Sequence, residues 1–560
     1  SIMKLQVLFF SLLFSSLTFA QNTNPLSKII ATYEQINQTD TTQLWPDLSE
    51  SKLAEKYLAL KTVALDLQQL NKYELSVSDQ INKDLLELII EDQLFHLQFE
   101  SHLFPLNSEG GFITGILYRL QYYRVDSETD FQKYLAILRA LPDYLQMRKQ
   151  QMQKGQKLGK SSPRLVVSNC IKLMDQTLVT KTNDSFFLDP VRGEEKQKKE
   201  VIKVLEQEVL PAYRNFRQFL NDEYLQNAPE NIGISGITNG KKFYEQRTRF
   251  FTTFDITPQE VFETGQREVK RIRAEMQQII DDLGFEGSFA DFIAFLRTDE
   301  QFYAKTPKAL LKEAAWITKR MEGKLPFYFN KFPRMPLTVK PVPAAIAPNY
   351  TGGRYSEGSY QQQKAGEYWV NTYKLKSRPL YVLPALSLHE GVPGHHTQIM
   401  LAAELENMPD FRRNTYLSAY GEGWALYTEF LGKEAGIYET PYEDFGRLVY
   451  EMWRACRLVV DPGMHYMGWT RQQAFDFMAS NTALSIHEVN TEIDRYIGWP
   501  GQAVSYKMGE LKIKELRKLA EEELGADFDI RTFHDLILAN GSVPLNTLER
   551  LVKTWLKNEK

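Results

Sequence analysis

The segment from Ser387 to Gln398 places the tightest constraint on the fold, because it carries three of the eight histidines in a chain of 560 residues. These are His389, His395 and His396, and Glu390 follows the first of them. Two neutral imidazoles beside a carboxylate are what a zinc hydrolase uses, as metal ligands and as the base that activates water. The segment therefore predicts a metal site.

The spacing of these histidines does not suit a straight helix. The common zinc-protease motif H-E-x-x-H places both histidines on one helix face. Here His395 follows His389 by six residues, which is about 240° around the axis. His396 follows by seven residues and lies almost on the same face, but roughly 10 Å further along.

The Pro-Gly pair at 393–394 offers a solution, because proline removes a helical hydrogen bond and glycine allows unusual dihedral angles. We expect a break in the helix that brings His395 round to His389, with Glu390 facing the metal-bound water. His396 in place of His395 stays open as the ligand. The alternative is a Pro-Gly turn whose histidines bind nothing.

A second segment, Tyr420–Glu429, is apolar and carries two glutamates seven residues apart, Glu422 and Glu429. This spacing places both on one helix face, and a carboxylate buried in an apolar helix needs a partner. We expect Glu422 to be the third zinc ligand, with a fourth position open as in catalytic sites. Glu429 would orient an imidazole from outside. An exchange of these two roles stays open.

Helical periodicity dominates the rest of the chain. It is strongest in five long segments, Asp79–Glu100, Phe131–Gln156, Glu194–Asn221, Thr257–Leu283 and Thr306–Phe332. Residues 337–342 and 367–371 have strand composition and flank a Gly- and Tyr-rich segment, 350–360, that predicts a lid or a surface loop. Pro-Gly pairs predict turns at 461–466 and 499–502. The fold class predicted is mainly α-helical, a large metallopeptidase-like fold with a small β-sheet at the active-site cleft.

The N-terminus has the features of an export signal. Lys4 precedes an apolar run from Leu5 to Ala20, and Thr18-Phe19-Ala20 fits a cleavage site. The run of 16 residues is shorter than the roughly 20 of a membrane span, although an uncleaved anchor is the alternative. The cleavage point carries no cysteine, which argues against a lipid-attached form. We expect an exported protein, periplasmic or secreted, with no stable membrane insertion once the signal is cleaved.

Three regions follow from these patterns: a signal peptide at 1–20, a helical scaffold at 21–330 and a zinc-site catalytic region at 331–560. We expect the last two to form one continuous structural unit.

Composition excludes some classes of function. A net charge of −4 and the lack of a Lys/Arg stripe exclude a nucleic-acid partner. The two cysteines, Cys170 and Cys456, are too few for a structural zinc cluster, so histidine and carboxylate must hold any metal. Their spacing leaves open whether they pair.

The motif H-E-x-x-P-G-H at 389–395, followed by Gly-Glu-Gly-Trp-Ala at 421–425, resembles the bacterial domain-of-unknown-function 885 family. Asp-Pro-Gly-Met-His at 461–465 and Pro-Gly-Gln-Ala at 500–503 match two further elements of the family. The resemblance covers most of the chain and is strongest from about 340 to 520. It implies a mainly helical, metallopeptidase-like fold with a zinc site, favours the periplasm and leaves the substrate open.

The spacing of Glu422 and Glu429 is also similar to that in thimet-type oligopeptidases, in which the first glutamate binds zinc. That likeness is looser, because those enzymes keep an unbroken H-E-x-x-H.

Hydrolysis through a tetrahedral oxyanion needs a hydrogen-bond donor opposite the metal. The catalytic candidates besides Glu390 are Tyr506, His465 and Arg495. Arg354, Tyr355 and Asn371 are candidates for binding the substrate backbone or its carboxylate. A structural role is the alternative for each.

The favoured hypothesis is a zinc metallopeptidase with one Zn²⁺ per chain and a peptide or small amide as substrate. The alternatives are a zinc hydrolase of non-peptide amides or esters, and a helical envelope binding protein with a vestigial metal site. A general base such as Glu390 argues against the binding protein.

Overall fold

The computed structural model describes residues 24–559 apart from 43, 122, 192, 345 and 346. The signal peptide predicted at 1–20 lies outside these residues. The fold is mainly α-helical with one small mixed sheet, which confirms the predicted fold class. Within the described ranges, no helix is both long and apolar enough to cross a membrane.

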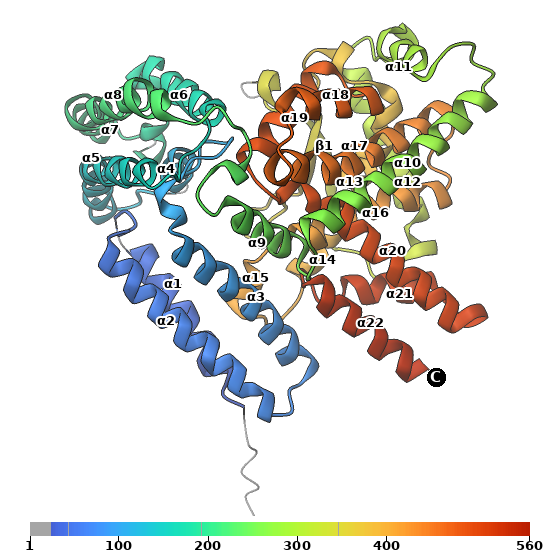
Figure 1. Cartoon of the computed structure of the whole chain (residues 1–560), viewed down its shortest axis with the longest axis horizontal. Coiled ribbons are helices and arrows are strands. Elements are labelled where there is room, and N and C mark those ends of the chain that lie inside the picture. The colour runs from blue at the N-terminus through green and yellow to red at the C-terminus, as the bar shows by residue number, and fades with distance from the viewer. Residues whose placement is uncertain (1–23, 43, 122, 192, 345–346, 560) are drawn as a thin grey trace, which may run out of the picture.

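The helices before the sheet occupy two regions. Helices α1 to α8 lie on the left of Figure 1, and α10 to α12 lie on the right with α9 between the two groups. Their bounds are α1 Leu26–Thr42, α2 Glu50–Gln69, α3 Val77–Phe99, α4 Phe112–Gln121, α5 Glu128–Lys157, α6 Arg164–Val179, α7 Glu195–Val204, α8 Leu210–Phe219, α9 Gly240–Thr252, α10 Pro258–Asp282, α11 Phe289–Thr298 and α12 Pro307–Tyr328.

The sheet and the remaining helices make up the rest of the molecule, with most of these helices on the right of Figure 1. Their bounds are β1 Leu337–Pro341, β2 Gly353–Ser356, β3 Gly366–Val370, α13 Leu383–Glu390, α14 His395–Ala403, α15 Asp410–Arg413, α16 Ser418–Glu434, α17 Pro441–Tyr466, α18 Arg471–Asn481, α19 Ile486–Gly498, α20 Ser505–Leu524, α21 Ile530–Leu538 and α22 Leu545–Glu559.

One cluster of buried hydrophobic side chains includes residues from Leu26 to Leu556 and so crosses the boundary proposed at residue 330. The division into a scaffold and a catalytic region stays a prediction.

Helix α17 is the centre of the C-terminal half. Every residue from Phe445 to His465 on this helix is buried, which requires other elements on all of its sides. Helix α10 packs closely along it, and a Cβ on Gly265 would lie 2.7 Å from the Cβ of Leu458. Helix α16 crosses α20 just as closely, because Gly423 lies against the backbone of α20. These contacts bury the helix that carries Glu422 and Glu429.

The sheet has the strand order β1-β3-β2, with β1 parallel and β2 antiparallel to β3. The two predicted strands correspond to β1 and β3. The hydroxyl groups of Tyr368 and Ser387 lie 3.0 Å apart and join β3 to α13. The sheet is thereby fixed beside the helix that carries His389 and Glu390.

Two local predictions were wrong. Residues 461–466 form the end of α17 rather than a turn, since packing on all sides of that helix outweighs the local preference of Pro462 and Gly463. The segment 350–360, predicted as a lid or loop, contains β2, whose backbone pairs with β3.

The two cysteines are free and buried, so no disulfide joins Cys170 to Cys456. Burial raises the pKa of the Cys170 thiol to about 12 and raises that of Cys456 as well. Neutral, buried thiols are chemically inert, which fits a packing role.

His534 is a buried histidine that the fold keeps neutral. Its Nδ1 lies 2.8 Å from the carbonyl oxygen of Tyr328, and its Nε2 lies 2.7 Å from the hydroxyl of Tyr427. The first contact requires Nδ1 to donate, so Nε2 accepts from the tyrosine. Burial lowers the pKa of His534 to about 3.

His534 therefore makes the free energy of unfolding depend on pH. In the unfolded chain the His534 imidazole binds a proton below its ordinary pKa of about 6.5. In the folded chain it binds one only near pH 3. The free energy of unfolding should fall by up to about 1.4 kcal/mol per pH unit between these values. Urea unfolding from pH 7 to pH 5 should show a shallower fall in His534→Gln than in wild type. The exposed His487→Gln is the control, and an equal slope in all three proteins would contradict the prediction.

Candidate metal centre

The histidine segment forms two helices with a short break. Helix α13 ends at Glu390 and α14 begins at His395. A side chain on Gly394 would overlap the carbonyl oxygen of His389, so this close turn requires glycine. The indole Nε1 of Trp424, on α16, donates to the carbonyl of Pro393 at 2.9 Å and holds the break in place.

This break brings His395 beside His389, and both face Glu422 on α16. The two imidazole rings lie with their centroids 4.8 Å apart and nearly perpendicular, at 87°. Nε2 of His389 is 3.1 Å and Nε2 of His395 is 3.2 Å from the same carboxylate oxygen, Oε2 of Glu422. One ligand atom from each of the three residues lies within 4.8 Å of the others. Such a group can hold a metal ion.

The donor set suits a catalytic metal such as zinc. Two imidazoles and one carboxylate are the ligands of many catalytic zinc sites, which keep a fourth position for water. The charges of His395 and His389 hold the pKa of Glu422 well below its usual range, although burial alone would raise it. Nδ1 of His395 is buried and has no hydrogen-bond partner among the described residues. Among the described residues, the contact with Glu422 is therefore the only polar contact of the His395 imidazole.

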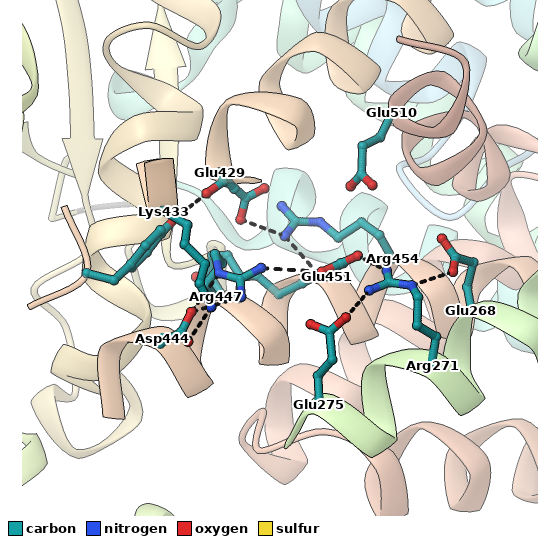
Figure 2. A network of polar contacts seen from close by, with 12 residues as sticks. Glu268, Arg271, Glu275, Glu429, Lys433, Asp444, Arg447, Glu451, Arg454 and Glu510 are labelled. Atoms are coloured by element: carbon teal, nitrogen blue, oxygen red, sulfur yellow. Dashed lines mark hydrogen bonds and ion pairs between the residues drawn. The ribbon is translucent and has the colours of Figure 1, made fainter. Parts of the chain in front are cut away.

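Glu429 contacts the other side of His389. Its Oε2 lies 3.0 Å from Nδ1 of His389, and its Oε1 lies 3.4 Å from the guanidinium of Arg454 on α17 (Figure 2). Burial alone would lower the pKa of His389, but its hydrogen bonds to Glu422 and Glu429 raise it to about 9. Glu429 is therefore placed to orient the His389 imidazole, whereas Glu422 faces the Nε2 atoms of both histidines.

Glu390 lies at the edge of the group and is only half-buried. Among the described residues its carboxylate has no hydrogen bond or ion pair, yet the charges of His389, His395 and Glu422 all act on it. Burial raises the pKa of Glu390. A carboxylate with a raised pKa next to a metal group is suited to accepting a proton.

His396 lies outside the group and is held by other partners. Its Nε2 is 2.8 Å from the carbonyl of Met335, and its Nδ1 is 2.8 Å from the hydroxyl of Tyr355. Both nitrogens are thus occupied. Tyr355, predicted to bind substrate, instead fixes this histidine.

Two further candidates also have structural roles. The Asn371 amide donates to backbone carbonyls of Ala347 and Thr351, both at 3.0 Å, and so holds that backbone in place, although the residue also lines a pocket beside α13. His465 accepts from the amide of Ile234 at 3.0 Å through Nδ1, and its Nε2 lies 2.8 Å from the carbonyl of Tyr496. Its imidazole has no free nitrogen to offer an oxyanion.

The remaining candidates have the following surroundings. Tyr506 is half-buried, and the Arg457 guanidinium lies 4.1 Å from the centre of its ring. Arg495 is held by Gln502 at 2.8 Å and by Glu492 at 3.2 Å. Burial alone would lower the pKa of Arg354, but its hydrogen bond to the Tyr350 hydroxyl raises it, with a smaller contribution from the charge of Glu390.

Tyr416 belongs to the site, but no sequence pattern pointed to it. Its hydroxyl lies 3.3 Å from Oε1 of Glu422, and the residue is 48% exposed. Burial of the hydroxyl and the charge of Glu422 raise its pKa well above the usual value, with smaller effects from Tyr506 and Glu390. A side chain on Gly421 would collide with this ring.

The sequence around this site matches a known protein family over most of its length. The family model of bacterial proteins of unknown function, DUF885, matches residues 30–552. The chain belongs to the DUF885 family. This confirms the resemblance carried by the H-E-x-x-P-G-H motif, which the match includes.

Solved structures show the same fold as this DUF885 chain. A predicted lipoprotein from Colwellia psychrerythraea is 26% identical, with a TM-score of 0.85 over 96% of this chain and 100% of that one. A predicted lipoprotein of unknown function from Shewanella oneidensis is 18% identical, with a TM-score of 0.73 over 94% and 97%. A comparison with curated proteins finds no match.

The geometry predicts which residues bind metal in this DUF885 protein. Elemental analysis should find one divalent ion per chain in wild type and a loss of at least tenfold in His389→Ala, His395→Ala and Glu422→Ala. His396→Ala is the matched control and should keep its metal, because both nitrogens of that imidazole have other partners. Loss in His396→Ala alone would show that the wrong histidine had been chosen.

Proposed function

We propose that this protein is an exported zinc-dependent metallopeptidase that hydrolyses peptide bonds. The observation that carries the proposal is the convergence of His389, His395 and Glu422, with Glu390 adjoining the first of them. Neutral imidazoles with a carboxylate favour zinc over magnesium or calcium, which prefer oxygen ligands alone.

Zinc, when bound, polarises the carbonyl of the substrate and lowers the pKa of its water. Glu390 then accepts one proton from the attacking water and delivers it to the nitrogen of the leaving amine. A C–O bond forms and the C–N bond breaks, so water is divided between the two products. Glu390 directly follows His389 and has no hydrogen bond or ion pair among the described residues, so its carboxylate is available to hold the proton between the two transfers.

Hydroxyl groups at the same site are proposed to stabilise the oxygen of the carbonyl as it becomes negative. Tyr416 is the first candidate, because its hydroxyl already lies beside Glu422. Tyr506 is the second candidate. Arg495 is proposed as a third donor to the same oxygen. Arg354, which is exposed and lies near Glu390, is proposed to bind the substrate backbone or a carboxylate.

Export is proposed from the predicted signal peptide at 1–20 and from the description of the two similar structures as predicted lipoproteins. The first cysteine of this chain is Cys170, so a signal-proximal cysteine for lipid attachment is not part of the proposal.

The decisive test is Glu390→Gln with peptide substrates. This variant should keep its zinc, because Glu390 is not among the grouped ligands, but lose roughly 10²- to 10⁴-fold in kcat. A chelator should abolish wild-type turnover and zinc should restore it. The matched control is Glu286→Gln, an exposed glutamate on the α10–α11 connection that should behave as wild type.

Three results would contradict the peptidase. Hydrolysis of esters or other amides but no peptide would keep the centre and change the substrate class. Zinc without turnover of any substrate would favour a binding protein. Full activity in Glu390→Gln would remove its role as general base.

Tyr416→Phe tests the oxyanion donor. Loss of one such donor should lower kcat by roughly 10²- to 10³-fold with little change in KM. Zinc content should stay at wild-type level, because the hydroxyl contacts Oε1 of Glu422 and not the oxygen that faces the histidines. Tyr506→Phe, measured in parallel, shows which of the two tyrosines carries the effect. An unchanged kcat in both variants would exclude this role.

A further inference from the structure

A pocket opens beside the candidate metal centre and is separate from the ligands. The space within it that water-sized groups can occupy is about 40 Å³. The walls are mainly apolar, and two charged side chains, Arg378 and Glu488, also line it.

The pocket lies next to Glu390. Two of its lining residues, Leu383 and Leu386, belong to α13 and precede Glu390 by seven and four residues. Both spacings place the leucines on the helix face of Glu390; the Cβ atom of Leu386, four residues away, lies about 5–6 Å from that of Glu390, and Leu383 lies roughly 10 Å along the axis. A substrate with its scissile bond at Glu390 would therefore present an adjoining side chain to this pocket.

Glu488 is an unpaired carboxylate in this wall. Among the described residues its side chain has no hydrogen bond or ion pair, although it is only half-exposed. Glu492, one turn further along α19, is by contrast paired with Arg457 at 3.1 Å and with Arg495 at 3.2 Å. A partly buried carboxylate without a partner is unfavourable unless a ligand supplies the opposite charge.

Arg378 acts on Glu488 through its charge but forms no hydrogen bond or ion pair with it among the described residues. Its Nε donates to the carbonyl of Tyr373 at 3.1 Å. It stands on the segment before α13 and lines the pocket with Gly352 and Pro379.

We propose that this pocket selects the substrate by taking a side chain with an apolar stem and a basic end, lysine or arginine, whose cation pairs with Glu488. This inference rests on the proposed peptidase function. The stem of such a side chain would pack on leucines while its charged end reaches the carboxylate, which is how long basic side chains divide between apolar and polar surroundings.

The preference should depend on pH. Burial raises the pKa of Glu488 to about 7, with a further increase from Glu492 on the same helix. The charges of Arg378, Arg454 and Arg457 act in the opposite direction, and Tyr450 on α17 also lines the pocket. The carboxylate is therefore ionised above pH 7 and neutral below it, so pairing with a cation strengthens as the pH rises.

The first experiment compares two peptides that differ at one position beside the scissile bond, lysine against its neutral analogue norleucine. At pH 8 wild type should cleave the lysine peptide with a kcat/KM roughly tenfold higher or more, since one charged hydrogen bond is lost in the other peptide. The ratio should fall at pH 6. In Glu488→Gln the ratio should approach one at both pH values. Glu286→Gln is the matched control and should keep the wild-type ratio.

A binding measurement separates the pocket from the peptidase. Calorimetry at pH 8 with n-pentylamine and its neutral isostere n-pentanol should show tighter binding of the amine to wild type and no preference in Glu488→Gln. An amine preference without cleavage of any peptide would keep the pocket and reject the peptidase. Equal binding of amine and alcohol by wild type would overturn the proposal. So would a preference for a glutamate peptide that Arg378→Gln abolishes, because the arginine would then set the polarity.

Discussion

The contact of Glu429 with His389 is the interaction on which the arrangement of the centre depends. Glu429 is 2% exposed, and a carboxylate so deeply buried must be paired. Nδ1 of His389 and the guanidinium of Arg454 both pair with it. Three helices, α13, α16 and α17, therefore meet at one carboxylate. Because Nδ1 is committed to Glu429, the Nε2 atom is left to face Glu422 and His395. One buried charge thus sets both the ring orientation and the helix packing.

Helix α17 can carry Arg454 in the interior because a larger set of buried charges fixes its rotation (Figure 2). Arg447, Glu451 and Arg454 lie on it at spacings of four and three residues, so they share one face. Glu451 pairs with Lys507 of α20 at 3.0 Å and with Arg271 of α10. Burial alone would raise the pKa of Glu451, yet these cations hold it well below its usual range. Rotation of α17 would strip several buried ions of their partners, which costs several kcal/mol for each ion. The network on one side of α17 therefore keeps Arg454 against Glu429.

Local patterns in the sequence predicted the helices, strands β1 and β3, and the break at Pro393-Gly394. Each of these depends on residues that are near one another in the chain. The grouping of His389, His395 and Glu422 followed from the chemistry that such residues need. Arg454 could not be predicted in this way, because its partner Glu429 lies on another helix. Nothing in the local sequence distinguishes Tyr416 or Glu488 from the other tyrosines and glutamates of the chain. His465 shows a further limit, because a conspicuous polar residue does not reveal whether its hydrogen bonds are already made inside the protein.

The distinction between paired and unpaired carboxylates shows where a substrate would lie. Glu422, Glu429, Glu451 and Glu492 all have cationic or imidazole partners, and they hold the structure together. Among the described residues, Glu390 and Glu488 have no such partner, and burial raises the pKa of both. Folding gains nothing from leaving these two carboxylates unpaired, since a partly buried charge without a partner costs free energy. A cost of this kind persists where the group acts on something outside the chain. The two carboxylates border one face of α13, so a substrate lying along that face would meet both, one at the bond to be broken and one in the neighbouring pocket.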